Sequence, residues 1–242
     1  MATAGIDSPA MARRSPAAFY TWGAVTAVLV VLAGFTRTFY LNPYLAKFPL
    51  TWLLELHGAI MTTWFATFFV QTRLIATGRT RIHRRVGVFG AIVALAVLVV
   101  ASTTAIVGAK LGHAPPGAPP PLVFLVVPLG DMVVFAGLVG SALLLRRKPE
   151  THKRLMLLGT LGILTAAIAR IPIPQLQAGG LPAFFLVTDV LVIGFVAWDT
   201  VRNRRLHPAF GWGAAYIILS QVVRFAIAGT PQWMAVAKWL TT

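Results

Sequence analysis

Six charged side chains and one histidine fall inside apolar stretches of the chain, in the half of each stretch that lies away from the basic turns, where ionisable groups are rare. A charge left unpaired near the centre of a bilayer costs roughly 2.5–3.5 kcal/mol on insertion scales. Three carboxylates and three guanidiniums balance one another, so we expect them to face the interior of a helical bundle and to pair or line a polar pocket. An arginine fork in such a pocket suits a carboxylate or phosphate group on a ligand. The residues are Glu55, Asp131, Asp189, Arg37, Arg170, Arg224 and His57.

Glu55 and His57 open the same apolar stretch but lie on different faces of the helix it predicts. Glu55 shares its face with Gly58, a small residue typical of a close helix contact. His57 lies in a stripe with Met61 and Trp64, bulky groups able to line a flat cavity. His57 is therefore the candidate ligand of a metal ion or a haem iron. The alternative is a histidine hydrogen-bonded within the core.

Three further histidines, His83, His152 and His207, open later apolar stretches beside basic residues. A helix N-terminus among cations disfavours the imidazolium form and leaves a neutral ring that can donate, accept or bind metal. If these helix ends converge, the three rings form an inner metal site. The alternative is helix capping and contact with lipid headgroups.

The elements that must position these groups are membrane-spanning helices. Of the 242 residues, 57% are hydrophobic and only 11% are charged, too little polar surface for a soluble fold of this size. A helix needs about 20 apolar residues to cross a bilayer, and a spanning strand would need about 10 with alternating polarity. The chain predicts an all-α polytopic bundle of seven transmembrane helices, at 18–40, 52–75, 86–109, 122–145, 155–171, 181–201 and 210–228.

The net charge of +15 reflects orientation rather than nucleic-acid binding. With the N-terminus inside and the C-terminus outside, 15 of the 21 Lys and Arg residues lie at the inner ends of helices. We expect them to contact the anionic inner leaflet of a bacterial plasma membrane, with no nucleic-acid partner. They are Arg13, Arg14, Arg73, Arg79, Arg81, Arg84, Arg85, Arg146, Arg147, Lys148, Lys153, Arg154, Arg202, Arg204 and Arg205.

The domain organisation follows from these spans. Residues 1–17 are predicted to be a disordered cytoplasmic tail, 18–228 the seven-helix transmembrane domain, and 229–242 a short outer interfacial tail. Cysteine is absent, which excludes disulfides and thiolate metal sites.

The six helices after the first predict three hairpins with a shared pattern. Each hairpin has an acid in its descending helix, basic residues at the inner turn and a histidine opening the ascending helix. Arg170 and Arg224 follow their histidines by 18 and 17 residues, which places both toward the outer face. The pattern indicates three related repeats, or simply the basic turn that every inside-positive hairpin shares.

A resemblance adds to this reading. The residues Leu56-His57-Gly58, His83-Arg84-Arg85-Val86-Gly87 and Thr151-His152-Lys153-Arg154 resemble motifs of uncharacterised bacterial multi-pass membrane proteins. They are also similar to histidine-bearing hairpins of small membrane proteins linked to cytochrome oxidase maturation. The resemblance implies a link to haem or respiratory oxidases through His57, His83 and His152. The chain lacks the two pairs of deep histidines that a dihaem cytochrome needs.

Three functions remain open from the sequence. The leading hypothesis is a small ligand or cofactor bound in the outer-half pocket, most concretely haem in a respiratory or oxidase-assembly role, with His57 as axial ligand and arginines on the propionates. The second is a proton- or solute-coupled transporter that uses the intramembrane acids and arginines. The third is an assembly subunit without chemistry that contacts a membrane-protein partner.

Overall fold

The computed structural model describes residues 16–46, 49–115 and 117–242, and all regular structure in these ranges is helical. The prediction of an all-α membrane bundle is confirmed. The elements are α1 (Pro16–Phe35), η1 (Thr36–Tyr40), α2 (Asn42–Leu45), α3 (Trp52–Ala76), α4 (Thr80–Lys110), α5 (Pro121–Phe124), α6 (Val126–Leu144), α7 (Pro149–Leu161), α8 (Thr165–Ile168), α9 (Pro174–Ala178), α10 (Gly180–Asn203), α11 (Pro208–Ile227) and α12 (Pro231–Thr241).

Six helical segments among the described residues are long and apolar enough to cross a membrane. Each matches one of the predicted spans closely, so the chain is a multi-pass membrane protein. The predicted count of seven is not confirmed, because the fifth predicted span, 155–171, is divided between α7 and α8. Neither helix reaches the length of a spanning helix on its own.

The division between α7 and α8 is a local tightening of the helix rather than a change of direction. Gly162 and Leu164 keep right-handed helical angles, with ψ of −20° and −14°. The backbone N–H of Leu164 donates to the Leu161 carbonyl three residues earlier, at 3.1 Å. Such i to i+3 bonds define the tighter 3₁₀ turn. The segment ends at Arg170 because Pro172 and Pro174 cannot continue it.

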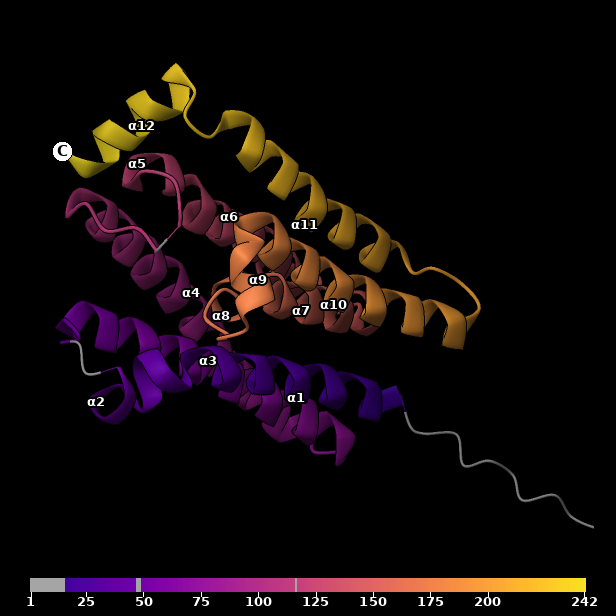
Figure 1. Ribbon diagram of the computed structural model, residues 1–242. Helices are drawn as coiled ribbons and strands as arrows, with labels where there is room; N and C mark the ends of the chain where they lie inside the picture. Colours follow the sequence, from indigo (N-terminus) through magenta and orange to yellow (C-terminus); the bar gives the residue numbers. More distant parts are fainter. Residues whose placement is uncertain (1–15, 47–48, 116) are drawn as a thin grey trace, which may run out of the picture.

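The α7–α8 segment forms the centre of the bundle. It contacts α1, α6, α10 and α11, and Figure 1 shows it among these helices. Four of its leucines and one isoleucine are almost completely buried. These side chains stabilise the core through van der Waals packing with the surrounding helices. They are Leu157, Leu158, Leu161, Leu164 and Ile168.

The turns at 77–79, 145–148 and 204–207 all lie at one end of the bundle, on the right in Figure 1. The basic rows at and beside these turns are largely exposed. We call this the basic end. The positive-inside rule assigns it to the cytoplasm, so the N-in orientation stays a prediction with a consistent charge distribution.

The opposite end is covered in part by α12. Ala237 of α12 is fully buried against Ala109 and Leu125, and the Trp233 indole N–H donates to the Leu122 carbonyl at 2.8 Å. Trp239 remains 75% exposed. The predicted outer tail 229–242 thus contains a packed amphipathic helix. Residues 1–15 of the predicted cytoplasmic tail lie outside the described residues.

Candidate functional site

Three of the predicted pocket residues meet on one face of α11. The Arg224 guanidinium donates to the Asp131 carboxylate at 2.5 Å and to the Ser220 hydroxyl at 3.0 Å. Three residues before Arg224, the Gln221 amide donates to the Asp189 carboxylate at 2.8 Å. We name these five residues the outer cluster, since they lie in the half of the bundle away from the basic end. It joins α6, α10 and α11.

The Asp131–Arg224 pair is closely enclosed. The two side chains are 11% and 6% exposed. A Cβ at Gly130 would lie 2.3 Å from the Arg224 Nε, so a larger residue there would require the guanidinium to shift away from α6. Among the described residues, that buried Nε has no hydrogen-bond partner. The Phe185 ring covers the guanidinium at 5.5 Å.

Asp189 differs from Asp131 in its partner. It is half-buried, and it accepts a hydrogen bond from the neutral amide of Gln221. Among the described residues no cation forms an ion pair with it. Sequence reasoning missed Gln221, although its spacing of three from Arg224 places both on one helix face.

A second polar cluster, at the basic end, was not predicted. Arg154 of α7 holds the Asp199 carboxylate of α10 through three hydrogen bonds of 2.8–2.9 Å, and it also donates to Glu150 at 2.6 Å. Both Arg154 and Asp199 are buried. Lys153 reaches the other oxygen of Glu150 at 2.6 Å. We name Glu150, Arg154 and Asp199 the inner cluster.

The pKa values at the basic end follow from these contacts. Partial burial alone would raise the pKa of Glu150, but hydrogen bonds from Lys153 and Arg154 outweigh it and hold that pKa below its usual range. Partial burial, and then the charge of Arg154, lower the pKa of His207. The neutral ring of His207 caps α11, because its Nδ1 accepts the Ala209 N–H at 3.1 Å.

The remaining predicted pocket residues lie elsewhere. Glu55 and Arg37 are exposed, and neither forms an ion pair among the described residues. The contact expected on the Glu55 face forms only farther along, where Phe39 of η1 packs on Gly58. A single pocket lined by all of the predicted residues is therefore not present.

His57 and Arg170 form a separate pair of groups. The charge of Arg170 acts on the His57 ring, whose buried Nδ1 has no hydrogen-bond partner among the described residues. The Arg170 guanidinium donates to the Ala166 carbonyl at 2.7 Å and stacks on Phe35 at 4.9 Å. No acid pairs with it in the described part of the chain.

The three inner histidines do not gather as a metal site requires. His83 and His152 interact electrostatically, and the His152 Nδ1 lies 2.8 Å from the Ala142 carbonyl oxygen. His207 instead interacts electrostatically with the charged groups of the inner cluster. Within the described ranges no group of three or more His, Cys, Asp or Glu side chains is placed to hold a metal ion.

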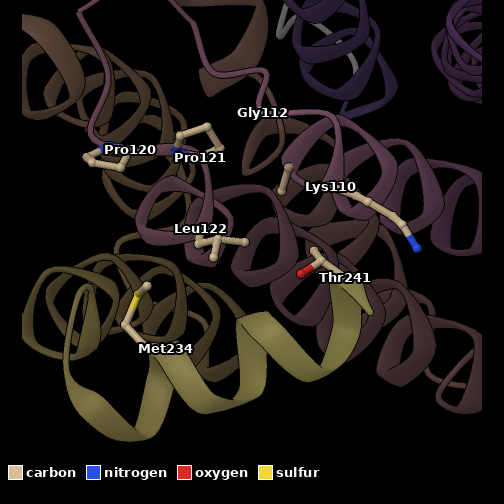
Figure 2. Close-up of a pocket in the computed structure, with 8 residues that line it drawn as sticks. Lys110, Gly112, Pro120, Pro121, Leu122, Met234 and Thr241 are labelled. Carbon is tan, nitrogen blue, oxygen red and sulfur yellow. The ribbon is translucent and has the colours of Figure 1, made fainter.

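Two pockets on the described surface avoid all of these groups. Figure 2 shows one of about 410 Å³ at the α12 end, where Lys110, Pro121, Leu122 and Met234 contribute to its wall. The other, of about 310 Å³, is an apolar groove between α1 and α3 that includes Val28, Tyr40 and Phe69. Neither is lined by a predicted site residue.

Comparison with protein-family models, with curated proteins and with solved structures finds no match to this chain. The two clusters and His57 are the features of the molecule that bear on its function.

Proposed function

We propose that the protein is a proton-coupled membrane transporter. The observation that carries this proposal is Asp189, an acid within a spanning helix whose partner is the neutral amide of Gln221. A carboxylate without a counter-charge inside the membrane is the arrangement expected of a group that exchanges a proton or a cation. Its neighbour on the same face of α11 is the Asp131–Arg224 pair, the ion pair that such exchange would disturb.

The tightened turn between α7 and α8 supports the same proposal. It lies beside a buried hydrogen bond of 2.9 Å between the Thr165 and Thr188 hydroxyls. Secondary transporters commonly form their substrate sites at irregular helical segments near the middle of the membrane. Thr188 directly precedes Asp189, so the tightened turn and the acid lie at one level of the bundle.

The test uses energised membrane vesicles from cells that produce the chain, with a fluorescent reporter of the pH gradient. A panel of solutes is added one at a time, and a solute that enters with protons collapses the gradient. We expect at least one solute to do so with the wild type and none with Asp189→Asn or Asp131→Asn. The matched control is Glu55→Gln, an exposed acid that should retain the response. If no solute in the panel collapses the pH gradient in wild-type vesicles, the proposal is contradicted.

Haem binding at His57 is the second proposal, in a respiratory or oxidase-assembly role in a bacterial plasma membrane. It is favoured by the buried Nδ1 of His57, which has no hydrogen-bond partner in the described ranges, and by the nearby Arg170, which pairs with no acid there. His57 would supply one axial ligand, and Arg170 would hold a propionate. Arg224 forms an ion pair with Asp131, so it is not available to bind a propionate.

For haem, we expect the purified wild type to show a Soret band that shifts on reduction with dithionite. The band should be lost in His57→Ala and retained in His113→Ala, a control on an exposed loop histidine. The comparison is valid only if both variants are purified in the same yield and show the same helical circular dichroism signal. A featureless wild-type spectrum from haem-replete cells would remove this proposal. If the vesicles show no solute-driven proton entry and the spectrum shows no haem, the remaining hypothesis is an assembly subunit that contacts a membrane-protein partner.

A further inference from the structure

The two clusters join the same two hairpins at opposite ends. The α6–α7–α8 hairpin carries Asp131 and Arg154, while the α10–α11 hairpin carries Asp199 and Arg224. The inner cluster connects α7 to α10 at the basic end, and the Asp131–Arg224 pair connects α6 to α11 at the other. Arg224 lies 14 residues beyond Phe210, whose ring is under the Arg154 guanidinium, roughly 21 Å along α11.

Between these ion pairs the hairpins meet through small and hydroxyl-bearing residues. A Cβ at Gly213 of α11 would lie 2.4 Å from a methyl of Leu158, and a Cβ at Gly137 of α6 would lie 2.9 Å from the Tyr216 ring. The Thr165–Thr188 hydrogen bond completes this middle layer. Close contact through small residues allows one hairpin to pivot on the other, with the largest separation at the two ends.

We infer that the inner cluster and the Asp131–Arg224 pair are alternating gates, one closing the bundle at the basic end and the other at the opposite end. Breaking the bonds between Arg154 and Asp199 would open the inner gate. The α10–α11 hairpin would then separate from α7 at that end while the Asp131–Arg224 pair remains closed. The inference rests on the proposed transport function and adds to it the two ion pairs that open in turn.

Several charged or titratable groups surround the inner gate. Arg154 of α7 binds Asp199, and Tyr20 of α1 and His207 before α11 interact with Asp199 electrostatically. Glu150 contacts Arg154, Lys153 contacts Glu150, and the charge of Arg205 acts on His207. Among the described residues, the buried Tyr20 hydroxyl has no hydrogen-bond partner. Glu150 is 60% exposed and contacts Arg154, so it connects the buried acid to the solution through a shared guanidinium.

The experiment takes advantage of the absence of cysteine, since one introduced thiol is then the only reactive one. Thr188→Cys places it in the middle layer, where the wild-type side chain is fully buried. A membrane-impermeant thiol reagent is applied to either face of oriented vesicles. We expect slow reaction from both faces in Thr188→Cys alone. Adding Asp199→Asn should speed reaction from the basic end by about tenfold or more, and adding Asp131→Asn should do so only from the other end.

A second measurement avoids variants that fold poorly. Thr188→Cys alone is assayed at decreasing pH on the basic-end face, where protonation of the exposed Glu150 should weaken the inner cluster and speed the reaction from that face only. Equal acceleration from both faces would show general loosening and overturn the inference, as would no acceleration in either variant. The thiol assay needs no solute, so its result is independent of the transport assay. Side-specific thiol reaction without collapse of the pH gradient would reject coupled transport and support the gates. Collapse of the gradient without side-specific thiol reaction would reject the gates and leave coupled transport standing.

Discussion

Arg154→Ala is expected to lower the free energy of unfolding by about 3–5 kcal/mol, the range for removing one partner of a buried ion pair. Its loss leaves the Asp199 carboxylate, 6% exposed, without the three hydrogen bonds it accepts from Arg154. The measurement is unfolding by titration with a denaturing detergent in mixed micelles, followed by far-ultraviolet circular dichroism.

Two controls separate this result from a general effect of lost charge. Arg147→Ala removes an exposed arginine from the turn before α7 and should change stability by no more than about 0.5 kcal/mol. The double variant Arg154→Met, Asp199→Leu removes both charges and should recover most of the loss. If Arg154→Ala unfolds at the same detergent fraction as Arg147→Ala, the inner cluster contributes no stability.

Gly34→Ala is expected to destabilise the bundle by roughly 1–3 kcal/mol, the typical cost of overpacking. A Cβ at this position of α1 would lie 2.1 Å from the backbone oxygen of Ala167 in α8. Backbone cannot rotate aside as a side chain can, so α1 must move away from the central segment. The thermal unfolding midpoint in detergent should fall accordingly.

Gly194→Ala is the matched control for this prediction. Gly194 lies in the interior of the spanning helix α10, and no neighbouring heavy atom lies within 4 Å of a Cβ built there. Alanine in a helix interior is more stable than glycine by roughly 0.5–1 kcal/mol, so this variant should unfold slightly later than the wild type. Opposite signs for the two substitutions would locate the effect at the α1–α8 contact. A fall of equal size in both would contradict that explanation.

The sequence could predict the spans and the interior position of Asp131 and Arg224, because hydrophobic length and the cost of intramembrane charge depend on local composition. It could not tell which acid each arginine meets. That choice depends on α11 lying between α6 and α10, a tertiary arrangement that no spacing encodes.

The inner cluster was missed for a different reason. Arg154 ends a basic row, a pattern that predicts an orientation signal, and Asp199 precedes another such row. The one sequence signal for the cluster is the i to i+4 spacing of Glu150 and Arg154, which places the two side chains on one helix face where they can form an ion pair. The prediction for Glu55 was wrong. Its small neighbours predicted that the acid lies in a helix contact, but the contact is made by Phe39 with Gly58, and Glu55 is exposed.

The central position of α7–α8 has a consequence for biogenesis. The first turns of α7 carry Glu150, Lys153 and Arg154, which leaves an apolar stretch of only about 14 residues before Ala169, a length more typical of a buried core helix than of an autonomous span. The translocon releases segments into lipid according to their own hydrophobicity. This segment must therefore enter the bilayer together with α6, its neighbour in the hairpin, and the chain's most enclosed helix depends on its partners for insertion as well as for packing.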